Sequence, residues 1–124
     1  MLADLKKAKA GGFGASLAVS GAWLAVGASS SAGGGKVFMF KKQSNKWVQQ
    51  QVLTGPAGHN NFGALCMHGN TLAVTSSATG FPTKSSISIF TLSGNTWSLS
   101  QTLAQSSGAN NYWYNNIDMS DDGY

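Results

Sequence analysis

Hydrophobic and polar residues alternate along this chain in short runs, and glycine, serine and asparagine separate one run from the next. Runs of this length, rich in β-branched and aromatic residues and bounded by turn residues, are typical of β-strands. The pattern predicts two groups of four antiparallel strands. The expected strands are Ser16–Ser20, Trp23–Ala28, Lys36–Lys41, Lys46–Thr54, Leu65–His68, Thr71–Ser76, Ser86–Leu92 and Thr96–Ala104.

The first four expected strands differ in how apolar they are. Trp23 to Val26 and Val37 to Phe40 are apolar at consecutive positions, which is typical of strands covered on both faces. Trp47 to Leu53 is polar in its middle, which fits a solvated outer strand. The fourth strand of each group is therefore expected at an edge.

The two groups are copies of one unit of about 50 residues. Phe13 recurs as Phe62, Leu24 as Leu72 and Phe40 as Phe90, at offsets of 49, 48 and 50 residues. Two further anchors are Asn45-Lys46-Trp47 with Asn95-Thr96-Trp97, and Gln51-Val52-Leu53 with Gln101-Thr102-Leu103. A repeated unit that cannot bury its own apolar face stacks on its neighbours. A four-stranded unit of this size describes a β-propeller blade.

At these residues the chain resembles a family, the FG-GAP repeats of integrin-like β-propellers. The likeness rests on Phe13-Gly14, Leu17 to Gly21, Leu24 to Ala28, Val37 to Phe40, Trp47 and Gln51 to Leu53. The second copy departs from it, since Thr75-Ser76-Ser77 stands in place of Gly27-Ala28-Ser29, and neither copy has the family's proline after the Gly-Ala pair. The resemblance implies an extracellular, cell-surface or virion-surface protein that uses loops for protein or glycan contacts.

The expected organisation is two blades within an incomplete ring. Residues 1–11 form an N-terminal segment that ends a preceding outer strand, 12–60 the first blade, 61–109 the second, and 110–124 the first strand of a further blade. Closed propellers have typically four to eight blades. The chain is therefore expected to be a piece of a longer polypeptide, or to join further copies of itself or another protein partner that completes the propeller.

Charge and cysteine content exclude several classes of function. The net charge of +4 comes from eight lysines and no arginine, whereas nucleic-acid sites depend on arginine forks. No nucleic-acid partner is expected, and no membrane insertion, because no apolar run is long enough to span a bilayer. The single cysteine, Cys66, excludes an intrachain disulfide and occupies a position expected to hold a small buried residue.

Catalytic and metal chemistry have few candidate residues. The chain has four acids, two histidines and one cysteine, from which no nucleophile triad or carboxylate pair can be assembled. His59 and His68 have no nearby zinc-ligand partners. The first turn of each copy lacks the carboxylates that calcium requires, and Asp121-Asp122-Gly123 is expected to form a plain turn. We therefore expect no enzyme activity, no metal and no cofactor.

Aromatic residues are the remaining candidates for binding. Trp47 and Trp97 are equivalent in the repeat and are expected to pack the outer strand onto a neighbouring blade. Tyr112-Trp113-Tyr114 with its flanking asparagines breaks the repeat, as ligand-binding residues of repeat proteins do. Phe81 is expected in a loop that presents it to a partner. The expected function is a non-catalytic structural or adhesion module that binds proteins. The alternative is a lectin that binds a glycan through the Tyr112 to Tyr114 cluster.

Overall fold

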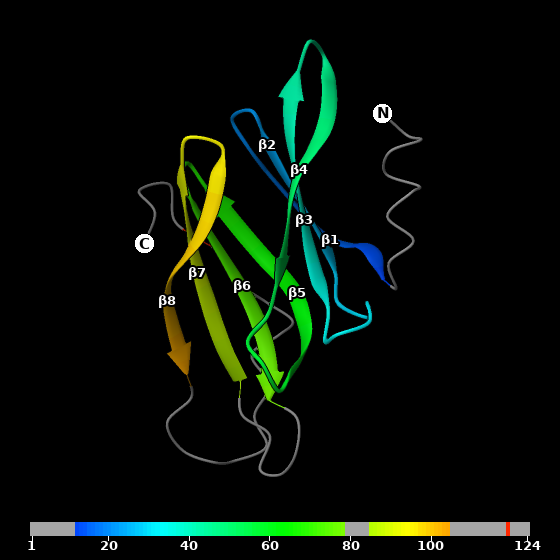
Figure 1. The fold of residues 1–124 in the computed structure, drawn as a ribbon, viewed down its shortest axis with the longest axis vertical. Coiled ribbons are helices and arrows are strands. Elements are labelled where there is room, and N and C mark those ends of the chain that lie inside the picture. Colours follow the sequence, from blue (N-terminus) through cyan, green and yellow to red (C-terminus); the bar gives the residue numbers. More distant parts are fainter. Residues whose placement is uncertain (1–11, 79–84, 105–118, 120–124) are drawn as a thin grey trace.

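The computed structural model describes residues 12–78, 85–104 and 119. Within them, eight strands form two four-stranded antiparallel sheets (Figure 1). Sheet A has the order β1-β2-β3-β4, and sheet B the order β5-β6-β7-β8. The strands of sheet A are β1 Phe13–Ser20, β2 Trp23–Ala28, β3 Lys36–Gln43 and β4 Lys46–Thr54. Those of sheet B are β5 His59–His68, β6 Thr71–Ala78, β7 Ser85–Ser93 and β8 Thr96–Ala104.

The all-β class and the grouping into two four-stranded antiparallel sheets are confirmed. The predicted bounds of β2, β4 and β8 are those of the structure, while the other five strands are longer than expected. The largest difference is β5, which begins at His59 and not at Leu65, because a bulge between Asn60 and Ala64 hides the alternation there. The described residues form two sheets and not a closed ring.

The repeat is visible in the geometry of the sheets. The pairing of β3 with β4 is interrupted at Met39/Phe40, and that of β7 with β8 at the equivalent Ile89/Phe90. The main-chain N–H of Lys42 donates to Ala22 at 2.7 Å, and that of its counterpart Leu92 donates to Asn70 at 2.9 Å. From Ser16 and Ala64 onward both sheets therefore share one backbone plan, and residues there can be compared position by position. Just before these residues the backbones differ, since Gly14 has a φ of 89° and Gly63 is not in the left-handed region.

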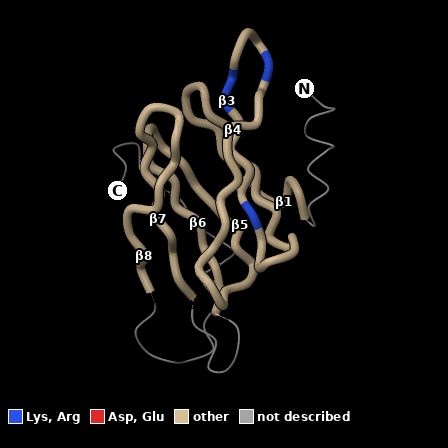
Figure 2. Tube along the Cα trace, in the orientation of Figure 1, with Lys and Arg blue, Asp and Glu red and all other residues tan. Residues whose placement is uncertain are grey.

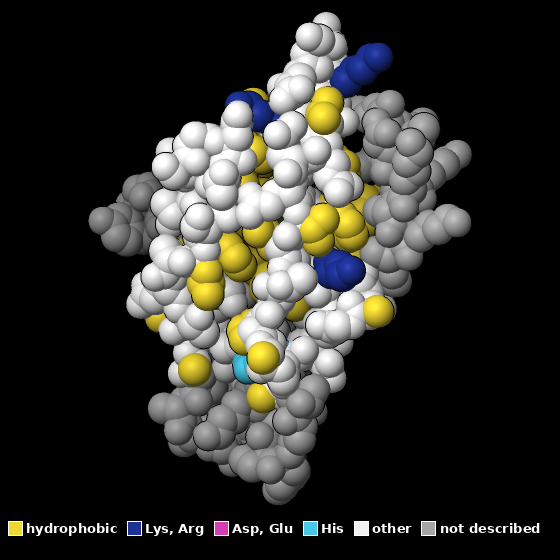
Figure 3. All heavy atoms as spheres, viewed as in Figure 1, with side chains coloured by type: hydrophobic (Ala, Val, Ile, Leu, Met, Phe, Trp, Pro, Cys, Tyr) yellow, Lys and Arg dark blue, Asp and Glu magenta, His cyan; other side chains and the backbone are white. Residues whose placement is uncertain are grey.

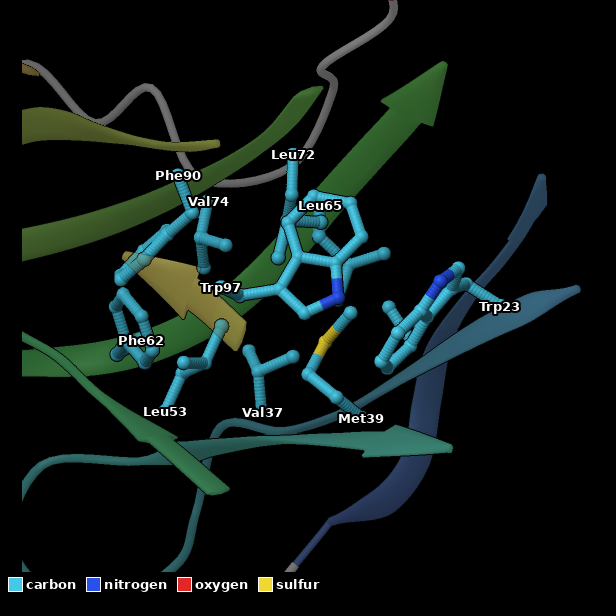
Figure 4. Packing of buried hydrophobic residues seen from close by; sticks show 11 residues of the cluster. Trp23, Val37, Met39, Leu53, Phe62, Leu65, Leu72, Val74, Phe90 and Trp97 are labelled. Atoms are coloured by element: carbon cyan, nitrogen blue, oxygen red, sulfur yellow. The ribbon is translucent and has the colours of Figure 1, made fainter. Parts of the chain in front are cut away.

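Sheet A packs face to face on sheet B around one hydrophobic core, with β5 in contact with β1, β2 and β3. The Trp97 ring lies at its centre, between Trp23 and the aliphatic side chains of sheet B (Figure 4). Trp97 is 1% exposed, and its ring meets Trp23 edge to face at 5.6 Å between centroids. The expectation that Trp97 packs the outer strand onto the neighbouring sheet is confirmed.

Each sheet has a second face, which we call its outer face. Residues opposite one another in the register share a face, so Leu17, Val26, Phe38 and Val52 line the outer face of sheet A. Val26 and Phe38 belong to a separate buried cluster with Phe40, against which Trp47 packs. Trp47 therefore lies on the outer face of sheet A, whereas its counterpart in sheet B, Trp97, faces the core between the two sheets.

Among the described residues, the structure contains no helical segment with the length and hydrophobicity that a membrane crossing requires. Cys66 is buried, as expected from its place in the repeat.

Candidate functional site

A glutamine bridges the two sheets. The Gln51 amide, on β4, donates from Nε2 to the main-chain oxygen of Trp97 at 2.7 Å and accepts from the Trp97 N–H at 2.8 Å. The side chain thus pairs with the outward edge of β8 as another strand would. We call these two hydrogen bonds the glutamine bridge. It fixes the position of β8 relative to β4.

Within the described residues, three more hydrogen bonds that involve side chains join the sheets. Ser16 Oγ donates to the carbonyl of Gly63, and the Gly69 N–H donates to Ser20 Oγ at 2.8 Å. The Lys41 ammonium donates to Asn95 Oδ1 and lies 5.6 Å from the centroid of the Trp23 ring. These bonds link both ends of the intersheet contact and set one orientation of sheet A on sheet B.

The backbones of β2 and β5 approach closely at Gly27. A Cβ atom on Gly27 would collide with the carbonyl of Gly63 and with Ser16 Oγ. Gly63 is itself confined, since a Cβ there would lie 3.0 Å from the Ser29 nitrogen. The two glycines therefore allow the sheets to pack at this distance.

In the repeat, the outer face of sheet A corresponds to one face of sheet B. That face of sheet B is the one on which sheet A packs. The β1 edge of the outer face of sheet A is uncovered, because Leu17 and Val19 are each 61% exposed. Leu65, the counterpart of Leu17, is 8% exposed because sheet A packs on it. Figure 3 shows hydrophobic side chains that reach the surface on one face of the molecule. Isolated apolar side chains are common at surfaces, but Leu17 and Val19 lie where the equivalent strand of sheet B is covered.

Lysines are the charged side chains of the described residues. Lys41, Lys42 and Lys46 gather on the β3–β4 hairpin, and Lys36 begins β3 (Figure 2). The four acidic residues of the chain all lie outside the described ranges. Lys41 is engaged in the intersheet contact, so this group includes a structural cation and is not simply a free basic patch.

A histidine and two serines form a polar cluster where β5 begins. His59 Nδ1 lies 3.0 Å from Ser76 Oγ and 3.2 Å from Ser86 Oγ, and the two hydroxyls are 3.2 Å apart. A histidine next to a serine is the arrangement of a general base and a nucleophile. Both serines, however, are buried, so neither hydroxyl is open to a substrate. The cluster ties β5 to β6 and β7.

Burial lowers the pKa of the His59 imidazole, because the ring loses solvent that would stabilise its charged form. The unfolded chain then binds the proton more readily than the folded chain. We expect the free energy of unfolding to be highest above about pH 6.5 and to fall as the pH drops through the lowered pKa of the folded state. Thermal unfolding between about pH 7.5 and pH 5 measures this loss.

The variant His59→Asn is expected to show a smaller loss of stability over the same range, because it removes the group whose pKa is shifted. The matched control is His68→Asn, at an exposed position, which should keep the full loss. Equal acid sensitivity in His59→Asn and the parent chain would contradict the assignment.

The predicted binding residues Phe81, Tyr112, Trp113 and Tyr114 lie outside the described residues, so their role in binding stays a prediction. His59 and His68 stand at opposite ends of β5, and among the described residues no group of three or more His, Cys, Asp or Glu could hold a metal.

Sequence reasoning missed the two residues that define the intersheet contact, Gln51 and Gly27. A signal for the first was present, since glutamine recurs at position 101. Comparison of the chain with protein-family models, with curated proteins and with solved structures gives no match. The FG-GAP resemblance therefore stays a prediction.

Proposed function

We propose that this chain is a non-catalytic structural and interaction module, whose two sheets are consecutive blades of a β-propeller. In this proposal the outer face of sheet A receives a further four-stranded sheet, supplied by a longer chain or by a protein partner. In repeat proteins, each unit packs on the next through the same pair of faces, and together the units form one continuous hydrophobic core.

A single observation carries the proposal. Leu17 and Val19 are exposed on β1, whereas the equivalent strand, β5, is the part of sheet B that sheet A covers. A sheet on the outer face of sheet A would cover the exposed β1 edge in the same way. Burying an aliphatic side chain of this size contributes about 1.5–3 kcal/mol, so covering both is a substantial driving force.

The glutamine bridge supports the same arrangement. Trp47 occupies the same position in β4 as Trp97 in β8. Trp47 lies opposite Lys42 of β3, and Trp97 lies opposite Leu92 of β7. The Trp47 main chain therefore lies where a glutamine from an incoming sheet would form a second bridge. The outer face of sheet A thus repeats both the apolar and the hydrogen-bonding features of the intersheet contact.

A chain with a third sheet tests the proposal. In this longer chain, residues 1–61 are followed directly by residues 13–124. Phe13 then follows Asn61, as Phe62 does in the parent chain, and one copy of sheet A is added in front of the original. We expect one cooperative unfolding transition with a midpoint several degrees above that of the parent chain, because the added sheet buries Leu17 and Val19 of the original. Circular dichroism during heating measures it.

The substitution Leu17→Asp provides a matched pair of controls. In the original sheet A it should remove the gain in stability, because a carboxylate would be buried against the added sheet. In the added sheet, whose β1 edge stays uncovered, the same substitution should leave the gain intact. A third sheet that unfolds separately, or adds no stability, would refute the proposed function.

A further inference from the structure

The lysines of the described residues all lie on one hairpin, formed by β3 and β4. They are Lys36, Lys41, Lys42 and Lys46. The hairpin of β7 and β8 has the same pairing and the same irregularity, and carries uncharged residues at the equivalent positions. These are Ser86, Thr91, Leu92 and Thr96. The fold of the hairpin therefore does not require the lysines.

Three of the four lysines gather where β3 turns into β4. We call residues 41–46 the lysine tip. This hairpin extends farther than the other hairpins at one end of the molecule (Figure 1), and lysines stand on both of its strands (Figure 2). Residues 42–46 are all exposed. Lys41 is half-buried, and its ammonium group is held by Asn95 Oδ1.

Protection of a sheet edge does not explain these lysines. Lysine is a common residue on edge strands, where it discourages pairing with another chain. Lys41 and Lys42, however, belong to β3, which pairs with β2 and with β4 and has no free edge. The edge strand β8, which is equivalent to β4, has no charged side chain in residues 96–104. The sheets of this fold thus do not depend on lysine at their edges.

The charge of the lysine tip is not offset by the part of the chain that the structure describes. No acidic side chain lies within residues 12–78, 85–104 and 119. Like charges at neighbouring positions of a hairpin repel one another and destabilise it. An anionic partner would replace this repulsion by attraction. The lysine tip is therefore a surface that favours a partner with several negative charges.

We propose that the lysine tip binds an acidic polysaccharide, whose sulfate or carboxylate groups contact Lys41, Lys42 and Lys46. Residues 41–46 contain no apolar side chain, so the tip has nothing to insert into a bilayer and no anchor of the kind that dominates protein interfaces. The chain has no arginine, the residue on which nucleic-acid recognition depends. The proposal goes beyond the proposed function and does not require a third sheet.

The turn between the lysines suits a sugar chain. Ser44 and Asn45 have φ values of 49° and 63°, as in the tight turns that close hairpins. Their hydroxyl and amide groups both donate and accept hydrogen bonds, and so can bind sugar hydroxyls between the anionic groups. An ammonium group has three donors, so Lys41 can bind an anion and keep its hydrogen bond to Asn95. Its fixed position lowers the entropy that binding costs.

Binding of the full chain to heparin, a sulfated polysaccharide, tests the proposal by surface plasmon resonance. We expect binding that weakens as the salt concentration rises, because salt screens exposed charges. Lys42→Gln combined with Lys46→Gln should weaken it at least about fivefold, as the loss of two exposed ion pairs allows. Lys41 stays unchanged in this variant, because its loss would also affect the contact between the sheets.

The matched control is Lys6→Gln combined with Lys7→Gln, which removes the same charge at positions outside the described residues. It should bind heparin nearly as well as the parent chain. Equal weakening in the two double variants would show that only net charge matters and would overturn the proposal, as would a parent chain that does not bind heparin. Circular dichroism establishes that each variant is folded.

Two other polyanions test the choice of partner. Polyglutamate presents carboxylates on a polypeptide, and vesicles with phosphatidylserine present them on a membrane. We expect both to bind the parent chain more weakly than heparin does, because neither offers sugar hydroxyls to the turn. Equal or tighter binding of either one, lost in the variant of Lys42 and Lys46, would overturn the assignment to a polysaccharide.

Discussion

Replacing Trp97 by alanine is expected to destabilise the chain by about 3–5 kcal/mol, the usual cost of removing a large buried aromatic side chain. The Trp97 ring is almost fully buried and contacts Trp23 across the two sheets. Figure 4 shows it in the middle of the cluster, over Met39. Its loss would leave a cavity between sheet A and sheet B that neither sheet can fill without moving. Domains of this kind are stable by about 5–15 kcal/mol, so much of the total would be lost.

Urea unfolding of the parent chain and the variant measures this difference. The matched control is Trp47→Ala, the same substitution at the equivalent position. Trp47 is half-buried on the outer face of sheet A, so its removal should cost distinctly less. Equal losses at the two positions would show that Trp97 does not hold the sheets together.

A third substitution separates packing from hydrogen bonding at Trp97. The indole Nε1 is buried and has no hydrogen-bond partner among the described residues. Trp97→Phe keeps an aromatic ring and removes this unsatisfied donor, so it should recover a large part of the stability lost in Trp97→Ala.

The strands were predictable because local pattern and repeat agree. Trp23 to Ala28 and Lys46 to Thr54 are bounded by turn residues, and their copies have the same spacing. Where prediction failed, the backbone departs from a regular strand. Asn61 has a φ of 57° within the bulge of β5, so the run from His59 does not alternate and was not expected to be a strand.

The intersheet contact was less accessible to sequence reasoning. Gln51 was interpreted as part of a solvated edge strand, because it and the preceding Gln49 and Gln50 make the middle of this run polar. Its partner is the main chain of Trp97, 46 residues away, and main-chain groups have no signature in a sequence. Gly27 was recognised as part of a Gly-Ala pair, but the Gly63 carbonyl that requires glycine there becomes visible only when β2 and β5 are packed together.

Replacing Gly27 by alanine tests that packing. We expect a loss of about 3 kcal/mol, at the upper end of the range for overpacked positions, because the new methyl group meets the Gly63 carbonyl and Ser16 Oγ. The serine can change its rotamer, but the carbonyl belongs to β5 and can move only with the strand. Sheet A and sheet B would have to separate, and the hydrogen bonds of the glutamine bridge would lengthen. Urea unfolding gives the loss of stability.

The control for Gly27→Ala is Thr75→Ala, which places the same residue at the equivalent position of β6. Thr75 already carries a Cβ atom, and its hydroxyl makes one long hydrogen bond of 3.4 Å to Ala64. The control should therefore lose less than half as much stability as Gly27→Ala. If both variants lost the same amount, alanine would be unfavourable at this strand position for a local reason, and the close approach of β2 to β5 would not explain the glycine. A large loss at Gly27 alone would show that the distance between the sheets depends on the missing side chain.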